Sequence, residues 1–260
     1  MDLKNIKGFL IDMDGTTYLS HRLLPGAKDF LDFLHRNKKP YLFFTNNPSS
    51  SVKDYVKKFH ELGLTQVKEK NIITSGQATI EYLKSHKINK IYLLATPSYE
   101  AEIKKAKIKL TDRNPQAVIL SFDKTLTYKK LETAAHLLAN KKIKYIATNP
   151  DLVCPTINGP IPDCGAIAAL LEKATGRIPL YIGKPNKGMV LAAAKRLGLK
   201  PETMAIIGDR LYTDMKMAIN HKLTSILVLS GETKKSDLQK SDLEPDYVFE
   251  NLRELLTKLK

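Results

Sequence analysis

The fold is decided by residues 9–17, which read Phe9-Leu10-Ile11-Asp12-Met13-Asp14-Gly15-Thr16-Thr17. An apolar run ends there in two carboxylates one residue apart, followed by a glycine and two hydroxyls. Residues 8–11 are short, continuous and apolar, which predicts a strand buried on both faces of a parallel sheet. Ligands of open α/β sheets bind outside the carboxyl ends of the strands, so these acids stand where chemistry is expected.

The pair Asp12 and Asp14 suggests a metal site. Alternation along an extended chain puts both side chains on the same side. Two carboxylates this close repel each other and are costly to bury unpaired. A divalent cation would offset that cost, and a site built from oxygen atoms suits Mg²⁺. The alternative is a solvated turn, because Asp and Gly are ordinary turn residues.

The composition is that of a globular protein with one large or two moderate domains. Of its 260 residues, 43% are hydrophobic and 27% are charged, which is enough apolar material for a core. No apolar run approaches the ~20 residues of a membrane span, and the first residues do not resemble a signal peptide. The two cysteines, Cys154 and Cys164, are too few for a disulfide framework and favour a reduced, cytoplasmic location.

The net charge of +15 raises the question of a nucleic-acid partner. The lysines are spread through nearly every predicted helix and turn, with no long basic tail and no recognised nucleic-acid module. Solvated helix faces explain them better, so neither a nucleic-acid nor a membrane partner is expected. The positive field would still attract anionic substrates such as phosphates.

Strand and helix patterns alternate along the chain, which predicts an α/β fold with a parallel sheet and right-handed crossovers. Residues 1–82 form the first part of a Rossmann-like core, and residues 179–260 form its second part. Residues 83–178 repeat the α/β pattern with different content and are predicted to be an inserted domain. A polar connector at residues 107–115 has room for a short strand.

Four predicted strands end in polar signatures. They end in Asp12-Met13-Asp14-Gly15-Thr16, Thr45-Asn46-Asn47, Gly183-Lys184-Pro185 and Gly208-Asp209 through Thr213-Asp214. If the four strands are parallel and lie in one sheet, all four signatures gather on one edge. That convergence weighs more than any single motif.

Each signature has a role in phosphoryl transfer. Asp12 is the expected nucleophile on phosphorus, and Asp14 is the expected acid and base. The Thr45 hydroxyl and the adjacent Asn46 and Asn47 would contact phosphate oxygens. Lys184 would place a positive charge on the phosphoryl group. Asp209 would be the metal ligand from a distant part of the chain, and Asp214 would orient the metal's water shell or Lys184.

Taken singly, each signature also has an ordinary explanation. Thr45-Asn46-Asn47-Pro48 has the composition of an Asx turn. Lys184 would be one more surface lysine, and Asp209 or Asp214 would cap a helix or a turn. All four explanations holding at once, in this order along the chain, is much less probable than one shared site.

With these four signatures the sequence resembles the haloacid dehalogenase superfamily of phosphohydrolases, in particular its type IIA branch of nitrophenylphosphatase-like, nucleotide and sugar phosphatases. The four signatures match the four motifs of that family in order, across nearly the whole chain. The resemblance implies a Rossmann-like core with an inserted C2-type cap domain. It also implies Mg²⁺ held by Asp12, by the main-chain carbonyl of Asp14, and by Asp209.

The predicted cap carries two segments that resemble substrate-facing segments of the same branch. They are Thr148-Asn149-Pro150-Asp151 and Pro160-Ile161-Pro162-Asp163-Cys164-Gly165. Asn149 and Cys154 are the candidate substrate-binding residues among them. The chain departs from the family at Cys154, where pyridoxal-phosphate-hydrolysing relatives carry a histidine, and at Asp163-Cys164, where a small pair is usual. Cys154 also fits the description of a small buried hydrophobe. Among the histidines, His21 alone falls in a loop expected over the site.

These observations predict a cytoplasmic, Mg²⁺-dependent phosphatase that acts on small phosphorylated metabolites through an aspartyl-phosphate. Sugar phosphates, nucleotides and phosphoglycolate-like compounds are the expected substrates. By analogy with the branch, two copies are expected to pair through the cap. Two alternatives stay open: a phosphotransferase or phosphomutase that uses the same intermediate, and a non-enzymatic basic binding protein.

Overall fold

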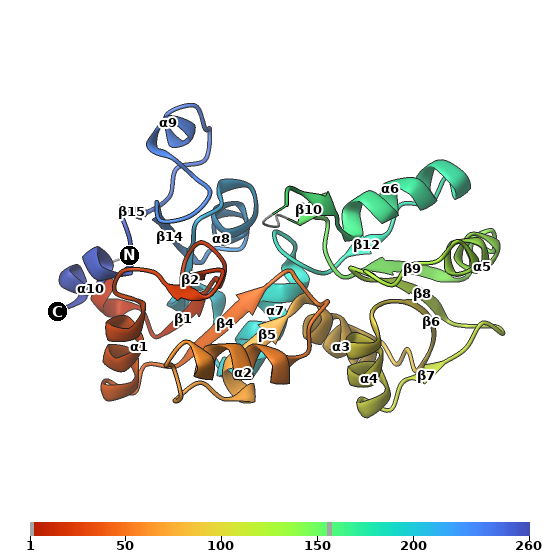
Figure 1. Ribbon diagram of the computed structural model, residues 1–260, viewed down its shortest axis with the longest axis horizontal. Helices are drawn as coiled ribbons and strands as arrows, with labels where there is room; N and C mark the ends of the chain where they lie inside the picture. Colours follow the sequence, from red (N-terminus) through yellow and green to blue (C-terminus); the bar gives the residue numbers. More distant parts are fainter. Residues whose placement is uncertain (1–2, 155–157) are drawn as a thin grey trace. The chain divides into compact units, whose positions relative to one another are not determined.

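The computed structural model describes residues 3–154 and 158–260 and divides the chain into two compact units. The first unit comprises Met1–Thr45, Lys53–Ile73 and Val190–Lys260. The second comprises Asn46–Val52 and Thr74–Met189. Each unit is built on its own parallel sheet (Figure 1).

The six-stranded sheet has the order β15-β14-β13-β1-β4-β5. Its strands are β1 (Gly8–Ile11), β4 (Tyr41–Thr45), β5 (Ile72–Thr74), β13 (Met204–Gly208), β14 (Thr224–Val228) and β15 (Tyr247–Phe249). Strand β1 lies between β13 and β4 and pairs parallel with both, with Ile11 opposite Ile207 and Phe43. The register therefore sets the carboxyl ends of these three strands at one level, where Asp12 and Asp209 follow.

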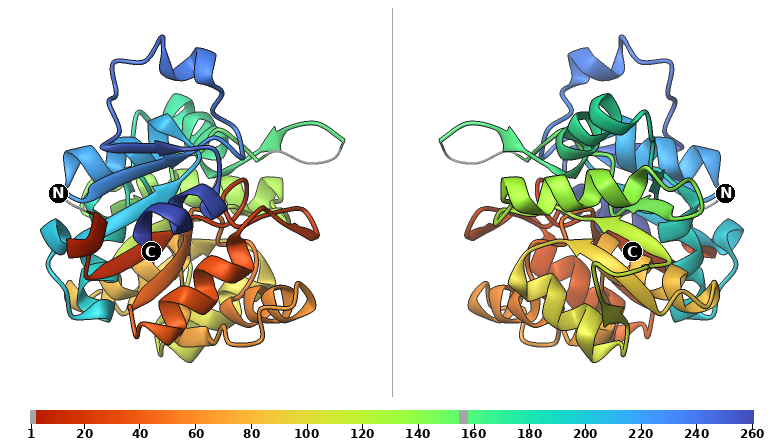
Figure 2. Two further views of the ribbon diagram at one scale, coloured as in Figure 1. Left: turned by 90° about the vertical axis from the view of Figure 1, so that its left-hand side faces the viewer. Right: turned by 90° about the vertical axis from the view of Figure 1, so that its right-hand side faces the viewer.

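Helices and short turns surround this sheet. The helices are α1 (Ala27–Arg36), α2 (Val52–Glu61), α7 (Lys187–Leu197), α8 (Lys216–Asn220), α9 (Lys235–Leu238) and α10 (Leu252–Leu259). Short helical turns are η1 (Leu3–Asn5), η2 (Glu69–Asn71), η3 (Pro201–Thr203) and the π-helical η4 (Leu211–Met215). The hairpin β2 (Tyr18–Leu19) and β3 (Arg22–Leu23) follows β1. Figure 2 shows α9 standing out from the six-stranded sheet on the chain between β14 and β15.

Helix α1 illustrates how the sequence positions these elements. Its apolar residues recur at helical spacing, so Ala27, Phe30, Leu31 and Leu34 share one buried face. The Phe30 ring packs edge-on against Phe9 of β1, with 5.8 Å between the ring centroids. The helix is thereby fixed against the central strand that carries the first acid.

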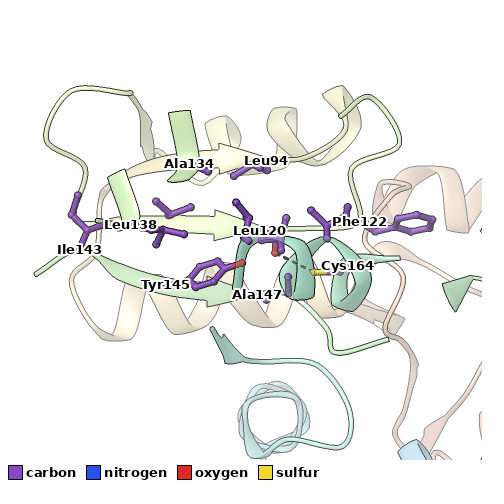
Figure 3. Close-up of a cluster of buried hydrophobic side chains, with 13 residues drawn as sticks. Leu94, Leu120, Phe122, Ala134, Leu138, Ile143, Tyr145, Ala147 and Cys164 are labelled. Carbon is purple, nitrogen blue, oxygen red and sulfur yellow. Dashed lines mark hydrogen bonds between the residues drawn. The ribbon is translucent and has the colours of Figure 1, made fainter. Parts of the chain in front are cut away.

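The second unit holds a five-stranded sheet of order β12-β9-β8-β6-β7. Its strands are β6 (Lys90–Leu94), β7 (Lys109–Leu110), β8 (Ala117–Leu120), β9 (Lys144–Ala147) and β12 (Leu180–Tyr181), and its helices are α3 (Ser75–Ser85), α4 (Pro97–Lys105), α5 (Tyr128–Leu138) and α6 (Cys164–Thr175). A two-stranded ribbon, β10 (Val153–Cys154) and β11 (Ile161–Pro162), precedes α6. Helices α5 and α6 bury an apolar face against β6, β8 and β9, which places Cys164 in a cluster with Leu120 and Ala147 (Figure 3).

The predicted α/β class and the parallel core are confirmed, and the connector at residues 107–115 does hold a strand, β7. One expectation is wrong: the strand at residues 180–182 does not join the core sheet. Leu180 and Tyr181 of β12 pair with Ile146 and Ala147 of β9 in the five-stranded sheet. The apolar pattern of a strand indicates that the strand is buried, but it does not indicate which strand it pairs with. The sequence therefore could not show which of the two sheets contains this strand.

The boundaries of the inserted domain stay a prediction. The second unit contains the whole of the predicted insertion, residues 83–178, within its longer segment Thr74–Met189, and it also contains the segment Asn46–Val52. Among the residues that the structure describes, none of the helices combines the length and the apolar character needed to cross a membrane.

Candidate active site

Three buried carboxylates meet at the carboxyl edge of the six-stranded sheet. Asp12 follows β1, Asp209 follows β13, and Asp214 lies in the π-helical turn η4. One carboxylate oxygen from each lies within 4.8 Å of the others. Carboxylates so close repel one another, which makes the cluster a candidate binding site for a divalent cation.

Asp209 sits in a cradle made by two loops. Its carboxylate accepts a hydrogen bond from the Thr16 hydroxyl at 3.1 Å and one from the backbone N–H of Glu232 at 2.7 Å. The Ser230 hydroxyl ties the same loop to the carbonyl of Gly15 at 2.9 Å. These bonds fix the orientation of a carboxylate that lies close to two others.

Glycines provide the room for the cluster. A Cβ atom on Gly15 would lie 2.4 Å from Asp209 Oδ2, and one on Gly231 would lie 2.0 Å from the same oxygen. A Cβ on Gly208 would lie 2.4 Å from the Cβ of Asp214. The acids are therefore packed against bare backbone, and Gly15 in addition adopts a positive φ of 84° in the turn after β1.

Asp14 occupies a different environment from the cluster. Its side chain is 55% exposed, and Oδ1 lies 4.0 Å from the ammonium of Lys58 on α2. Asp14 thus reaches solvent beside the cluster. The side-chain cluster of the described residues contains Asp214 and not Asp14. The predicted contact of a metal with the main-chain carbonyl of Asp14 stays a prediction.

Desolvation and like charge set the electrostatics of the acids. Burial raises the pKa of Asp209 to about 6, and Asp12 adds to the rise. Desolvation also raises the pKa of Asp14, against the lowering effect of Lys58. Burial alone would lower the pKa of Arg210, but the carboxylates, Asp12 first, raise it overall. Arg210 also pairs with Glu232, with 2.9 Å between Nε and Oε2.

In the second unit, the Asn46 side chain fixes the backbone of Lys184 by hydrogen bonds. The backbone N–H of Lys184 donates to Asn46 Oδ1 at 2.7 Å, and Asn46 Nδ2 donates to the carbonyl of Lys184 at 3.0 Å. Asn46 Nδ2 also donates to Asp151 Oδ2 at 2.8 Å. Both amide protons of Asn46 are thus engaged by protein groups, so its side chain positions Lys184 and has no donor left for a phosphate.

Asn149 is engaged in the same manner. Its Nδ2 donates to Asp151 Oδ2 at 2.9 Å and to Asp163 Oδ1 at 3.1 Å, and the side chain is fully buried. Asp151 therefore joins Asn46 and Asn149. Asn149 supports this network and offers no free donor to a substrate.

The other predicted site residues fall as follows. Asn47 Oδ1 accepts the backbone N–H of Ser49 at 2.9 Å, which is the Asx turn that the composition also predicted. Thr45 is the last residue of β4, next to β1, and is buried. Cys154 lies partly buried on β10, and His21 is exposed in the hairpin turn. Their predicted contacts with a substrate stay predictions.

The residues that hold Asp209 were not predicted from the sequence. They are Thr16 and the segment Ser230-Gly231-Glu232 after β14. A signal was present, because β14 is another apolar strand that ends in small and polar residues at the same edge of the sheet.

The donor set fits a small, hard divalent cation. All three groups of the cluster are oxygen ligands, and a carboxylate whose pKa is raised by burial and by a second carboxylate gains most when a cation replaces its proton. Asp12 and Asp209, with Asp214 beside them, are the side chains that would hold it.

Comparison with known proteins agrees with this arrangement. A model described as haloacid dehalogenase-like hydrolase matches residues 9–109, and a HAD-hydrolase-like model matches residues 181–255. The acid sugar phosphatase of Staphylococcus haemolyticus is 32% identical over 259 residues, 99% of this chain and 98% of that protein.

Solved structures extend the likeness to the whole fold. The 4-nitrophenylphosphatase of Thermotoga maritima is 44% identical, with 99% of each chain covered and a TM-score of 0.95. NagD from E. coli K-12 is 31% identical, with 98% of each chain covered and a TM-score of 0.90. The likeness runs through both units and all four motifs, and the chain belongs to the haloacid dehalogenase-like hydrolases, in the branch of the NagD and 4-nitrophenylphosphatase type.

Proposed function

We propose that this hydrolase is a Mg²⁺-dependent phosphatase that hydrolyses small phosphomonoesters through an aspartyl-phosphate. The observation that carries the proposal is the cluster of Asp12, Asp209 and Asp214 at the carboxyl edge of the parallel sheet, with Asp14 half exposed beside it. The relatives named as acid sugar phosphatase and 4-nitrophenylphosphatase support the same reaction class.

In the first step a carboxylate oxygen of Asp12 attacks phosphorus, and the bond from phosphorus to the leaving oxygen breaks. Asp14 gives its proton to that oxygen, so the leaving group departs as an alcohol. Thr45 and the backbone beside it bind the phosphoryl oxygens, and Lys184 contributes positive charge. Mg²⁺, when bound by Asp12, the Asp14 carbonyl and Asp209, would supply charge neutralisation to the phosphoryl group.

In the second step water attacks phosphorus of the aspartyl-phosphate while Asp14 takes the water's proton. The bond from phosphorus to the Asp12 oxygen breaks, which frees phosphate and restores the carboxylate. Asp14 thereby regains the proton it gave away, and the cycle closes.

Sugar phosphates are the first substrates to test, because the curated relative is named an acid sugar phosphatase. Nucleotides and phosphoglycolate-like compounds should be tested beside them, in one panel of phosphomonoesters. In the second unit, Cys154, which is partly buried on β10, is the residue that we propose as a substrate contact.

We also infer pairing of two copies through the second unit. Leu170, Ile178 and Leu180 are 50%, 68% and 49% exposed there, and β12 is an edge strand of the five-stranded sheet. Light scattering of the wild-type chain beside a Leu170→Glu, Leu180→Glu variant measures this directly: loss of the dimer in the variant is the expected result.

The deciding experiment is phosphate release from the panel, 4-nitrophenyl phosphate included, with Mg²⁺ and with a chelator. Wild type is compared with Asp12→Asn, which keeps the shape of the side chain and removes the nucleophile. Release that needs metal and disappears in the variant is expected. Turnover that survives in Asp12→Asn would end the nucleophile assignment, and phosphate transfer only to an added alcohol would favour a phosphotransferase.

A further inference from the structure

Lys58 of α2 reaches two groups that follow β1. Its Nζ lies 3.8 Å from the centroid of the Tyr18 ring and 4.0 Å from Asp14 Oδ1. The side chain is 27% exposed, whereas that of the adjacent Lys57, which pairs with Glu61, is 79% exposed. The Lys58 side chain is therefore less hydrated than that of Lys57.

The Tyr18 ring beneath this ammonium is fixed by its packing. Tyr18 is fully buried, and its ring packs edge-on against Phe59 with 5.7 Å between centroids. Phe59 in turn stacks on Phe43 of β4 at 4.1 Å. The backbone of Tyr18 closes the turn around Asp14, since its carbonyl accepts the N–H of Gly15 at 2.9 Å and its N–H donates to the carbonyl of Met13 at 3.1 Å.

The position is costly for a cation. Desolvation lowers the pKa of Lys58, and Asp14 opposes that effect. The face of Tyr18 supplies part of the compensation through the negative charge density of the ring. The carboxylate of Asp14, 4.0 Å away, adds to this compensation, so the ammonium and this carboxylate stabilise each other's location.

We propose that Lys58 is a positioning residue for Asp14: the ammonium, seated on the Tyr18 ring, holds the Asp14 carboxyl in the orientation that passes a proton to the leaving oxygen. The inference rests on the proposed function for the role of Asp14. Lys58 acts on the cleavage of the ester bond through Asp14 and not by contact with the substrate.

The leaving group separates this role from a merely structural one. An alkyl phosphate needs a proton on its leaving oxygen, whereas 4-nitrophenolate departs without one. Lys58→Met keeps the apolar stem on Tyr18 and removes the charge. We expect it to lower kcat/KM for glycerol phosphate and sugar phosphates about 100-fold, the scale of general acid catalysis, and for 4-nitrophenyl phosphate at most about threefold.

Lys58→Arg should recover most of the alkyl-phosphate activity, because it restores a cation over the ring. Lys57→Met is the matched control on the same helix and should leave both substrates within about twofold of wild type. An equal loss on both substrates in Lys58→Met, or no loss on either, would overturn the positioning role.

Failure of the proposed function looks different: the wild-type chain would release phosphate from neither substrate. Crystal structures of wild type and Lys58→Met then decide the positioning role without turnover. A displaced or multiply placed Asp14 carboxyl in the variant supports it, and an unmoved carboxyl overturns it.

Discussion

The backbone amide of Lys184 donates to the side chain of Asn46, 138 residues earlier in the chain, at 2.7 Å. The same asparagine donates to the Lys184 carbonyl and to Asp151. The second sequence motif thus holds the third, and the lysine's place depends on an amide that has no chemical step of its own.

Asn46→Ala is expected to lower the free energy of unfolding by about 2 kcal/mol, because it leaves the buried N–H of Lys184 without its acceptor. Turnover should fall by about tenfold or more if Lys184 has the proposed contact with the phosphoryl group, since misplacing such a cation by a fraction of an ångström is costly. Denaturant titration and phosphate release measure the two effects. Asn37→Ala, which loses only an exposed bond to Phe33, should change neither.

Magnesium should stabilise the protein more at neutral than at acid pH. The pKa of Asp209 is about 6 in the folded protein, above the ordinary value of 3.8. Between these values the metal-free native state keeps a proton that the unfolded chain has released, so stability falls as pH rises through this window, by about 3 kcal/mol in all. A cation binds the deprotonated carboxylate and removes that penalty.

Thermal melts with MgCl₂ and with EDTA, from about pH 4 to about pH 7, test this expectation. The difference in Tm between the two conditions should grow as pH rises and should vanish in Asp209→Asn. A magnesium effect of equal size at both ends of the range would contradict it.

Gly15→Ala should abolish metal-dependent turnover and the magnesium effect on Tm. The new Cβ would lie 2.4 Å from Asp209 Oδ2, and the carboxylate would have to leave its cradle. Gly63→Ala is the matched control, because Gly63 has a φ of 83° against 84° for Gly15 and nothing within 4 Å of the added carbon. It should cost only the ~1 kcal/mol of a left-handed backbone and leave activity intact.

The two cysteines should differ in reactivity. Burial raises the pKa of the Cys164 thiol to about 12, and its Sγ lies against the carbonyl of Leu120 at 3.5 Å (Figure 3). Cys154 is partly exposed. Iodoacetamide at mildly alkaline pH should label one site in the native protein and two in denaturant, as counted by mass spectrometry. Native labelling that persists in Cys154→Ser would show that Cys164 is accessible.

Sequence alone predicted the parts of the fold that rest on continuous apolar runs. Strands β1, β4 and β13 and the polar residues at their carboxyl ends were predicted because a buried strand and a polar end are both local signals. Strand β15, only three residues long, and the short helix α9 carry too little periodicity and were not predicted. The sheet to which β12 belongs is a matter of long-range pairing, which no local pattern states.

The site shows the same division. Residue types gave Asp12, Asp209 and Asp214 as acids of one edge, but the order of the chain could not tell that Asp214 faces the other two and Asp14 faces Lys58. Lys58 itself looked like one lysine of a solvated helix. Its contacts come from the packing of α2 against the turn after β1, which is a property of the folded chain.

The bare backbone around the acids has a consequence for inheritance. Any substitution of a glycine by another amino acid introduces a Cβ, and at Gly15, Gly208 and Gly231 that atom would meet Asp209 or Asp214. No amino acid lies between glycine and alanine in size, so no gradual route leads away from these positions. Gene lineages that keep the acids are therefore expected to keep a glycine at each of these three positions.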